Sequence, residues 1–491
     1  MSQQPSQNAF AMKPHAHHQT RFSAWTVATS SIALLLGGCA VGPDFQQPNL
    51  VPPAAFHSTA KASTNTRSDT SFADLKWQDV FKDPQLSAYI EEALIANWDI
   101  KIAASRLLEA EAAMGVERSR FFPSIFGAGD LYNTRSSENG PSGARPNSER
   151  SYGDAQVGIS SYEIDLWGNI RYANTAARAR YLQSEQAQHT VRQTLVSQVA
   201  ASYLNLLELD YELQIAEESL ATRQQSLTLT TAREKGGVAA MQDVVQAQIL
   251  VYSAQSSMVS IKRERDLQEN TLCILLGRNP TTLARGATFS DQRFSSSVPA
   301  GLPSSLIDRR PDIRSAEQGL VEANANIGQA KAAFYPQVTL TGSYGYQSVS
   351  SSDLFKSASR DWQFGPAVSL PIFTGGRLKS NLKITEAQYE TALSSYQQTV
   401  QNAFKEVSDA LVNYQRTREF ASSQTLLTQS NREAAELANI RYQGGVTSYL
   451  EVLYNEQELF SAELTLAQAE LSELLSVVQL YRALGGGWGG K

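Results

Sequence analysis

The sequence NIRYANTAARARYLQSEQAQHTVRQTLVSQVAASYLNLLELDYELQIAEESLATRQQSLTLTTAREK, residues 169–235, contains no glycine and no proline. Residues 377–443 form a second stretch of the same length with neither, and residues 238–276 and 446–484 are two shorter such stretches that match each other in length. Gly and Pro interrupt helices more strongly than any other residues, and helices in globular proteins average about 11–12 residues. The four stretches therefore predict two unusually long helical hairpins, 169–276 and 377–484, whose longer arms span roughly 100 Å.

The two predicted hairpins occupy equivalent places in two similar halves of the chain. The helical run 97–123, which begins NWDI and ends FFP, matches the run 310–336, which begins RPDI and ends FYP, at the same offset at both ends. REKGGV at 233–238 matches RYQGGV at 441–446 at a slightly smaller offset. Self-similarity of this kind indicates a repeat architecture. We therefore predict two tandem structural repeats, 72–290 and 291–491.

Within each half, a two-residue period replaces the helical one. Apolar and aromatic residues alternate with small or polar ones at 336–372, and a weaker pattern of the same kind lies at about 124–165. Strands of about ten residues with this alternation are typical of transmembrane β-barrels. Two strands per half give four per chain, which cannot close a barrel around a lumen, and lipid does not tolerate open edges. Several chains must then share one barrel, and three chains give twelve strands; the alternative is a soluble pair of hairpins.

Residues 1–38 predict a secretory signal peptide. Lys13 and Arg21 supply positive charge, and a short apolar core follows at 25–36. This core ends in Leu-Gly-Gly-Cys, which resembles the bacterial lipoprotein box, so Cys39 is expected to carry lipid. The alternative is an ordinary leader that contains a cysteine by chance. Residues 39–71 are rich in Pro, Ser and Thr and predict an extended tether.

The composition argues against several classes of partner and cofactor. The formal net charge is -6, which does not suit a nucleic-acid partner. The chain has two cysteines and five histidines, none at metal-ligand spacing, so we expect no metal site and no cofactor. Cys273 lies in an apolar run and is expected to be a small buried side chain. No stretch after the leader approaches the roughly 20 apolar residues of a membrane-spanning helix.

Apolar side chains in the last long stretch follow a strict 3-4 spacing, which predicts a coiled-coil seam. Its members are Leu450, Leu453, Gln457, Phe460, Leu464, Ala467, Leu471, Leu474, Val478 and Tyr481. The equivalent stretch of the first half begins in the same way, with Val245, Ile249, Tyr252, Ser256 and Val259, and then departs from the pattern at Arg263 and Asp266. These residues are interpreted as the packing of a wall and not as a cofactor site.

Four further motifs resemble those of one protein family. They are LPSSLIDRRPDIRSAE (302–317), ANANIG (323–328), PIFTGGR (371–377) and ALGGGW (483–488). In length and order they closely resemble the outer-membrane factor lipoproteins of Gram-negative tripartite efflux systems, the TolC-like outer-membrane efflux proteins. The resemblance implies an α+β membrane protein: a homotrimer with a twelve-stranded transmembrane β-barrel in the outer membrane, continued by a long α-helical barrel in the periplasm.

The same resemblance implies the function and the partners. The chain is expected to be the exit duct of an efflux pump that exports drugs or other small toxic compounds across the outer membrane. Its partners are expected to be outer-membrane lipid, a periplasmic membrane-fusion adaptor and an inner-membrane pump of the resistance-nodulation-division or major-facilitator type. Alternatives are an exit duct for protein secretion or metal export, and a structural coiled-coil lipoprotein that forms no channel. An enzyme is disfavoured, because the sequence has no Gly-rich phosphate loop, no HExxH motif and no nucleophile with a convincing base.

The turns of the two predicted hairpins are expected to be the periplasmic tips, which in the family narrow to a gate and contact the adaptor. Glycine there permits the positive φ that a tight reversal needs. The tip turns contain Gly236, Gly237, Val238, Gly444, Gly445 and Val446.

Gate residues are carried over from the family by position. Asp243 matches a carboxylate that bonds a tyrosine on the neighbouring helix pair, and Tyr442 matches that tyrosine. Glu451 matches a position whose side chains form a constricting acidic ring, three copies facing one lumen. Two positions depart from the pattern. Thr447 stands where some relatives carry an arginine that bonds the position of Gln242, and Tyr454 stands where some carry a second acidic ring.

Overall fold

The computed structural model describes residues 40–49, 52, 72–135, 137, 149–292 and 303–488. The predicted signal peptide 1–38, the lipidation site Cys39, most of the tether 39–71 and the predicted strand-hairpin loop 139–146 lie outside the described residues. The chain divides into two compact units. Unit 1 comprises residues 1–44, 117–174 and 325–385, and unit 2 comprises residues 45–116, 175–324 and 386–491.

The compact units do not coincide with the predicted repeats 72–290 and 291–491. Each unit takes corresponding segments from both halves of the chain. The physical reason is that strands from both halves pair in one sheet, while helices from both halves contribute to one apolar core. A similarity in sequence therefore marks equivalent segments here, and not separately packed bodies.

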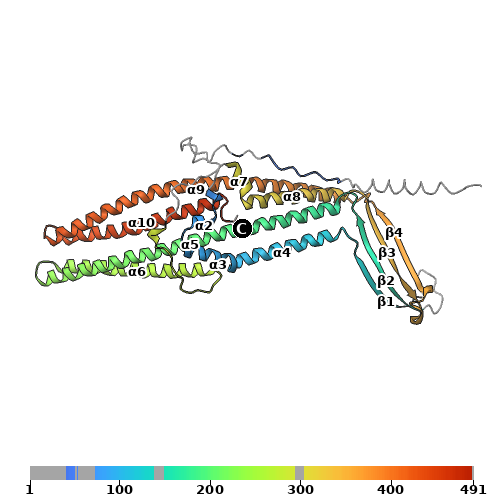
Figure 1. The fold of residues 1–491 in the computed structure, drawn as a ribbon, viewed down its shortest axis with the longest axis horizontal. Helices are drawn as coiled ribbons and strands as arrows, with labels where there is room; N and C mark the ends of the chain where they lie inside the picture. Colours follow the sequence, from blue (N-terminus) through green and yellow to red (C-terminus); the bar gives the residue numbers. More distant parts are fainter. Residues whose placement is uncertain are drawn as a thin grey trace, which may run out of the picture. The chain divides into compact units, whose positions relative to one another are not determined.

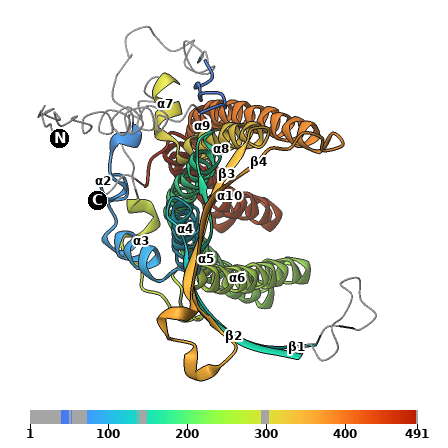
Figure 2. The ribbon, with the colours of Figure 1, turned by 90° about the vertical axis from the view of Figure 1, so that its right-hand side faces the viewer.

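Unit 1 contains a four-stranded antiparallel sheet. Its strands are β1 (Ile125–Arg135), β2 (Glu149–Ile164), β3 (Gln337–Ser348) and β4 (Arg360–Ser369), in the order β1-β2-β3-β4 (Figures 1 and 2). The β2–β3 pairing joins the two halves of the sequence, and a bulge between Ile159 and Tyr162 shifts its register. Within the described residues β1 and β4 are the edge strands, each paired on one side. Two short 3₁₀ turns, Ser351–Asp353 and Ser357–Ser359, lie between β3 and β4.

The strands show the predicted alternation, and their apolar face is uncovered in the single chain. Trp362, Phe364 and Val368 alternate along β4 and are 65 to 71 % exposed. Leu131 on β1 and Val157 on β2 are also exposed. The sheet therefore presents large apolar side chains that nothing in the described chain covers.

Unit 2 is helical, with four of its helices running on into unit 1. The short helices are α2 (Trp77–Val80), α3 (Pro84–Ala96) and α7 (Pro303–Arg309), and the 22-residue helices are α4 (Trp98–Ser119) and α8 (Pro311–Ala332). The long hairpins are α5 (Asn169–Lys235) with α6 (Met241–Leu275), and α9 (Arg377–Gln443) with α10 (Tyr449–Ala483) (Figure 1). Phe72–Asp74 and Phe289–Asp291 form 3₁₀ turns. The bounds of α5 and α9 coincide with the two longer stretches that lack Gly and Pro. No described helix is both long enough and apolar enough to cross a membrane.

The two hairpins end in the same way at their second helices. Gly277 follows α6 with φ 73°, and Gly485 follows α10 with φ 90°. In both turns the backbone N–H one residue later donates to a carbonyl five positions back, which is the Schellman arrangement of a helix C-terminus. The side chain of Asn97 donates to the Leu275 carbonyl (2.9 Å), and that of Arg310, at the equivalent position of the second half, donates to the Ala483 carbonyl (3.2 Å).

The main apolar core of unit 2 is built around the middle of α5. Along this helix Val196, Val199, Ala200, Tyr203 and Leu204 are fully buried. They pack with residues of α2, α3, α8, α9 and the ends of α6 and α10. Cys273 is buried in this cluster, as its apolar surroundings predicted, and its thiol lies 3.2 Å from the Thr281 carbonyl.

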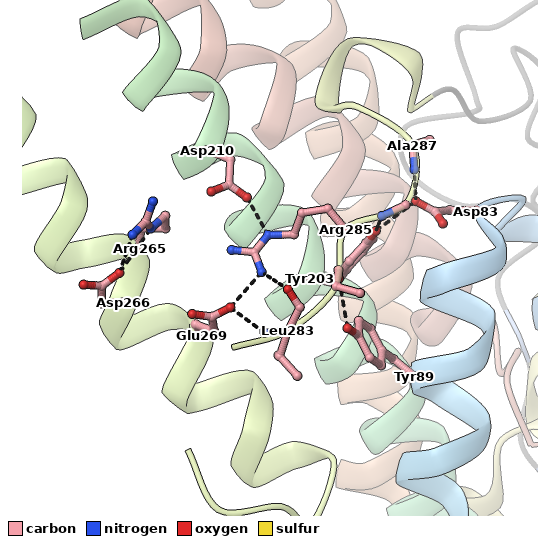
Figure 3. Close-up of polar contacts among 12 residues, drawn as sticks. Asp83, Tyr89, Tyr203, Asp210, Arg265, Asp266, Glu269, Leu283, Arg285 and Ala287 are labelled. Atoms are coloured by element: carbon pink, nitrogen blue, oxygen red, sulfur yellow. Dashed lines mark hydrogen bonds and ion pairs between the residues drawn. The ribbon is translucent and has the colours of Figure 1, made fainter. Parts of the chain in front are cut away.

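The loop that follows α6 is bound to the core by a polar network (Figure 3). Arg285 donates to Asp210 of α5 (2.6 Å) and to Glu269 of α6 (2.7 Å). Asp83, which caps α3, accepts a hydrogen bond from the hydroxyl of Tyr203 (3.1 Å). The network thus joins α3, α5 and α6 to the loop.

Within the described chain, most of the predicted seam is at least partly buried in α10, whereas its counterpart in α6 is exposed. Phe460, Ala467, Leu471, Val478 and Tyr481 are buried, although Leu450 and Gln457 at the tip end are exposed. In α6 the predicted seam faces outward, because α5 and α10 cover other faces of the helix. Its residues Val245, Ile249, Tyr252 and Val259 are exposed, whereas Val244, Ala247, Leu250 and Ala254 are buried.

The described start of the predicted tether is packed against the protein. The N–H of Gly42 donates to the hydroxyl of Tyr172 (2.8 Å), and a Cβ at Gly42 would lie 2.6 Å from the same ring. Val41 donates to the Trp167 carbonyl (3.4 Å). Phe45, which belongs to unit 2, packs against its main core. Residues 40–45 thus contact the protein through their apolar and glycine residues, and they contain no helix or strand.

Candidate functional site at the hairpin tips

The two hairpin turns have the same backbone structure. Gly237 and Gly445 both adopt φ 75°, so the predicted positive φ falls on the second glycine of each pair. In the first turn Gly237 N–H donates to the Glu234 carbonyl and Val238 N–H to the Arg233 carbonyl, both at 2.9 Å. The second turn repeats both bonds at the equivalent positions, at 3.0 and 2.9 Å. Any side chain with a Cβ is strained at positive φ, so glycine is needed at these two positions.

The turns expose their apolar residues. Val238 and Val446 are 70 % and 72 % exposed, and both follow the glycine of positive φ. An isolated exposed valine needs no explanation, but here the two equivalent positions carry the same side chain on the same turn. Each of the two tips therefore exposes a valine at the same position of the same turn.

Just behind the turns, a small apolar cluster joins the two hairpins. Its buried members are Ala247, Ala438, Tyr442, Tyr449 and Val452, with Leu227 and Leu453 packed against them. These residues come from all four long helices. The rings of Tyr442 and Tyr449 lie 5.3 Å apart at 59°, within the range of favourable aromatic pairs. The cluster is separate from the main core of unit 2.

Asp243 and Tyr442, which the resemblance joins by a hydrogen bond, are not bonded in the described chain. The Asp243 carboxylate accepts the Ala240 N–H (3.1 Å) and thereby caps the start of α6. The Tyr442 hydroxyl is buried and has no hydrogen-bond partner among the described residues. Asp243 lies near Tyr449 instead, whose pKa is raised by burial and further by Glu456, Tyr442 and Asp243. Within the described chain the Asp243 carboxylate thus bonds the start of its own helix, and its bond to Tyr442 stays a prediction.

Glu451 is held by its own hairpin. Its carboxylate pairs with Arg441 at the end of α9 (3.0 Å) and accepts a hydrogen bond from the Thr447 hydroxyl. Thr447 thus bonds the predicted ring position directly. Gln242 is exposed at the start of α6. The described chain brings Thr447 and Glu451 together.

Three charged residues that join or lie between the hairpins were not predicted from the sequence. Arg233 of α5 donates to the Tyr442 carbonyl of α9 (3.2 Å), and its guanidinium lies 4.6 Å from the centre of the Tyr442 ring. Arg223 and Glu456 are buried between the hairpins. The sequence carries one signal for the burial of Arg223, because Arg223 continues the 3-4 spacing of the apolar residues Ala216, Leu220 and Leu227.

The described residues contain no group of three or more His, Cys, Asp or Glu side chains placed to hold a metal ion.

Comparisons with known proteins identify relatives of the chain along almost its whole length. The model of the family described as outer membrane efflux protein matches residues 89–278 and again residues 302–486. The chain is 37 % identical to the probable efflux pump outer membrane protein TtgC of Pseudomonas putida, covering 93 % of this chain and 94 % of that protein. It is 34 % identical to the cation efflux system protein CusC of Escherichia coli K12, covering 93 % and 98 %. Its fold is similar to that of the open outer membrane channel MtrE of Neisseria gonorrhoeae, with a TM-score of 0.83, 31 % identity and coverage of 92 % and 99 %.

Proposed function

Since the chain belongs to the outer membrane efflux protein family, we propose that it is the exit duct of a tripartite pump, built from three copies that share one barrel. Members of this family are channels of the outer membrane of Gram-negative bacteria, not enzymes, and the chain is such an efflux channel. The proposal adds the three-copy wall, a lipid anchor at Cys39, and a periplasmic adaptor and inner-membrane pump as partners. Drugs or other small toxic compounds are the proposed cargo.

The observation that carries the three-copy wall is the unequal packing of two equivalent helices. α8 packs against α5 of the same chain: Arg180 pairs with Glu322 (2.6 Å), and Ser315 donates to the Gln183 carbonyl (3.3 Å). In α4, the counterpart of α8, Ala103 alone among 22 residues is buried. A helix that buries so little apolar surface is not stable alone, so α4 requires a partner.

The repeat supplies that partner. Because α9 is the counterpart of α5, the contact equivalent to α8 on α5 is α4 on α9. Ala179 of α5 is buried, whereas its counterpart Ala387 of α9 is exposed. The missing contact is therefore assigned to α4 of one copy and α9 of the next. The same family model matching both halves supports this equivalence.

The sheet leads to the same assembly. β1 and β4 are edges in the described chain, and lipid does not tolerate unpaired strand edges. Pairing β1 of one copy with β4 of the next continues the antiparallel order and closes a barrel at twelve strands when three copies join. The exposed side chains Trp362, Phe364 and Val368 would then face lipid.

Cross-linking tests the assembly. By the repeat offsets, Glu109 and Gln388 are the counterparts of Glu322 and Arg180, and both are exposed in the single chain. Purified Glu109→Cys/Gln388→Cys protein, treated with a short bismaleimide, is expected to give a covalent trimer on denaturing gels. Arg180→Cys/Glu322→Cys is the matched control and is expected to cross-link within one chain and to run as a monomer. Monomers alone from the first variant, or a ladder that continues beyond three copies, would refute the three-copy wall.

At the tips, we infer that the hairpin turns dock the adaptor and that the gate is held by the Tyr442 ring. Val238 and Val446 project from the two turns as the docking surface, and Glu451 is the acidic ring position of the lumen. Arg233 stacks on the Tyr442 ring and bonds its carbonyl, which joins α5 to α9. The Tyr442 hydroxyl contributes no bond within the described chain.

Two variants of Tyr442 separate the ring from the hydroxyl. Tyr442→Ala is expected to make cells several-fold more sensitive to vancomycin, a large antibiotic that a closed duct excludes, because the aromatic and cation–π contacts are lost. Tyr442→Phe is expected to leave sensitivity unchanged, since it removes a buried hydroxyl that has no partner among the described residues. Equal leakage from both would instead assign the latch to a bond between the hydroxyl and Asp243 in the assembled duct. No leakage from either would remove Tyr442 from the gate.

A further inference from the structure

A buried arginine lies between the two hairpins of unit 2. Arg223 is on α5 and is 2 % exposed. A buried guanidinium is costly unless it is both hydrogen-bonded and charge-compensated. Burial of Arg223 therefore requires hydrogen-bond acceptors and a negative charge close to its guanidinium.

The side chain of Arg223 reaches both hairpins. Its Nη1 donates to the Leu250 carbonyl of α6 (3.1 Å), which belongs to the same hairpin. Its Nη2 donates to Gln457 Oε1 of α10 (3.3 Å), which belongs to the other hairpin. The guanidinium also lies 5.0 Å from the centre of the Phe460 ring on α10. One side chain on α5 thus bonds to α6 and to α10.

Glu456 provides the opposite charge from the other hairpin. It lies on α10, is 8 % exposed, and accepts a hydrogen bond from Asn439 of α9 (3.2 Å). Burial raises the pKa of Glu456, while the Asn439 bond, the charge of Arg223 and the Ser226 side chain of α5 oppose that shift. Burial lowers the pKa of Arg223, and the charge of Glu456 opposes it. Each charge therefore stabilises the other, although no direct ion pair joins them among the described residues.

Both groups retain an unused polar atom. Arg223 Nε and Glu456 Oε2 are buried without a hydrogen-bond partner among the described residues. Buried groups without partners are uncommon, and each one weakens the arrangement that contains it. The two charges are thus buried among the long helices, and a loss of either one leaves the other uncompensated.

We propose that Arg223 and Glu456 are positioning residues that brace the α5/α6 hairpin against the α9/α10 hairpin and so keep the duct closed behind its tip. The brace rests on the proposed function and is distinct from the contacts of Tyr442. Parting the hairpins separates Arg223 from Gln457, Phe460 and Glu456 together. Removing one charge alone favours the parted state, because the remaining charge can then be hydrated. When both charges are removed, no uncompensated buried charge remains to favour the parted state.

A double-mutant cycle in the full-length protein tests the brace. The variants are Arg223→Gln, Glu456→Gln and the two combined, and the open probability of single channels is recorded in planar bilayers. Each single variant is expected to raise the open probability about tenfold, and the double variant to return to within about threefold of the wild type. Arg432→Gln is the matched control, because the Arg432–Glu463 pair (2.8 Å) joins α9 and α10 within one hairpin. It is expected to change nothing.

A distance measurement tests the brace independently of whether the protein conducts. Spin labels at Leu229→Cys of α5 and Leu437→Cys of α9, both exposed positions, report the separation of the hairpins. The distance is expected to lengthen in each single variant and to shorten again in the double variant. Unchanged distances in the single variants, or an effect in the double variant equal to the sum of the two, would overturn the brace. Distances that lengthen in a protein that never conducts would support the brace and refute the duct.

Discussion

Glu208→Gln is expected to stabilise the protein at neutral and alkaline pH and to have no effect near pH 4. Glu208 lies on α5 and is 4 % exposed, and Oε1 of its carboxylate has no hydrogen-bond partner among the described residues. Glu212, one turn further along, is also buried and accepts a hydrogen bond from Gln468 of α10 (2.9 Å). Burial raises the pKa of Glu208 from 4.5 to about 9, and the charges of Glu212 and then Glu264 add to the shift.

The direction of the pH dependence follows from proton binding. Between pH 4.5 and about 9 the folded chain keeps a proton on Glu208 that the unfolded chain has lost. The free energy of unfolding therefore falls as pH rises through this window, and it is unaffected by this group below it. Gln resembles the protonated acid at every pH, so Glu208→Gln removes this fall in the free energy of unfolding. At pH 7, which is 2.5 pH units above the ordinary pKa of 4.5, the variant is expected to be more stable by about 3 kcal/mol, from 1.36 kcal/mol for each pH unit.

The measurement is the thermal unfolding midpoint of the purified protein from pH 4 to pH 9. The Glu208→Gln midpoint is expected to rise above that of the wild type progressively with pH. Glu218→Gln is the matched control on the same helix, because Glu218 is exposed. A loss of stability that is equal at pH 4 and pH 8 would instead show that the Glu208 side chain stabilises the fold in both of its protonation states.

Arg310→Ala is expected to lower the free energy of unfolding by about 2–3 kcal/mol, because solvent screens the partly exposed carboxylates of Asp312 and Glu406. Arg310 is 8 % exposed and binds both carboxylate oxygens of Asp312, at 3.0 and 2.6 Å. It also pairs with Glu406 of α9 (2.7 Å) and donates to the Ala483 carbonyl at the end of α10 (3.2 Å). Without the guanidinium, two carboxylates lose their counter-charge and the carbonyl loses its donor.

The first half of the chain offers the matched control. Asn97, at the position equivalent to Arg310, donates to the Leu275 carbonyl at the end of α6 and accepts the Asp99 N–H at the start of α4. Asn97→Ala removes neutral bonds only and is expected to lower the free energy of unfolding by about 1–2 kcal/mol. Denaturant titration of both variants compares them. An Arg310→Ala loss no larger than the Asn97→Ala loss would mean that the ion-pair network contributes little.

The long helices and their turns were predictable because glycine and proline act locally. The ends of α5 and α9 coincide with the Gly- and Pro-free stretches, and positive φ occurs at Gly237 and Gly445 within the predicted turns. The alternation along β4 likewise depends on the sequence of the strand itself. These features need no knowledge of the neighbouring elements.

Features that depend on a neighbour were predicted less well. The sequence of α6 predicted a 3-4 spacing of apolar residues, but it did not predict which face of α6 packs on α5. Ile249 and Tyr252 lie on another face and are exposed in the described chain. A carboxylate can bond the start of its own helix or a group on another helix; within the described chain Asp243 does the former, and its bond to Tyr442 stays a prediction. Arg223 and Glu456 were missed because charged residues on a helix are expected at the surface, although both fall in apolar registers.

Three copies of this chain are proposed to form the wall of one duct. Single-channel recording of the cross-linked Glu109→Cys/Gln388→Cys trimer in a planar bilayer shows whether that assembly conducts. Discrete conductance steps are expected from the covalent trimer and none from the monomer fraction of the same preparation. A trimer that carries no current, or monomers that conduct equally well, would contradict it.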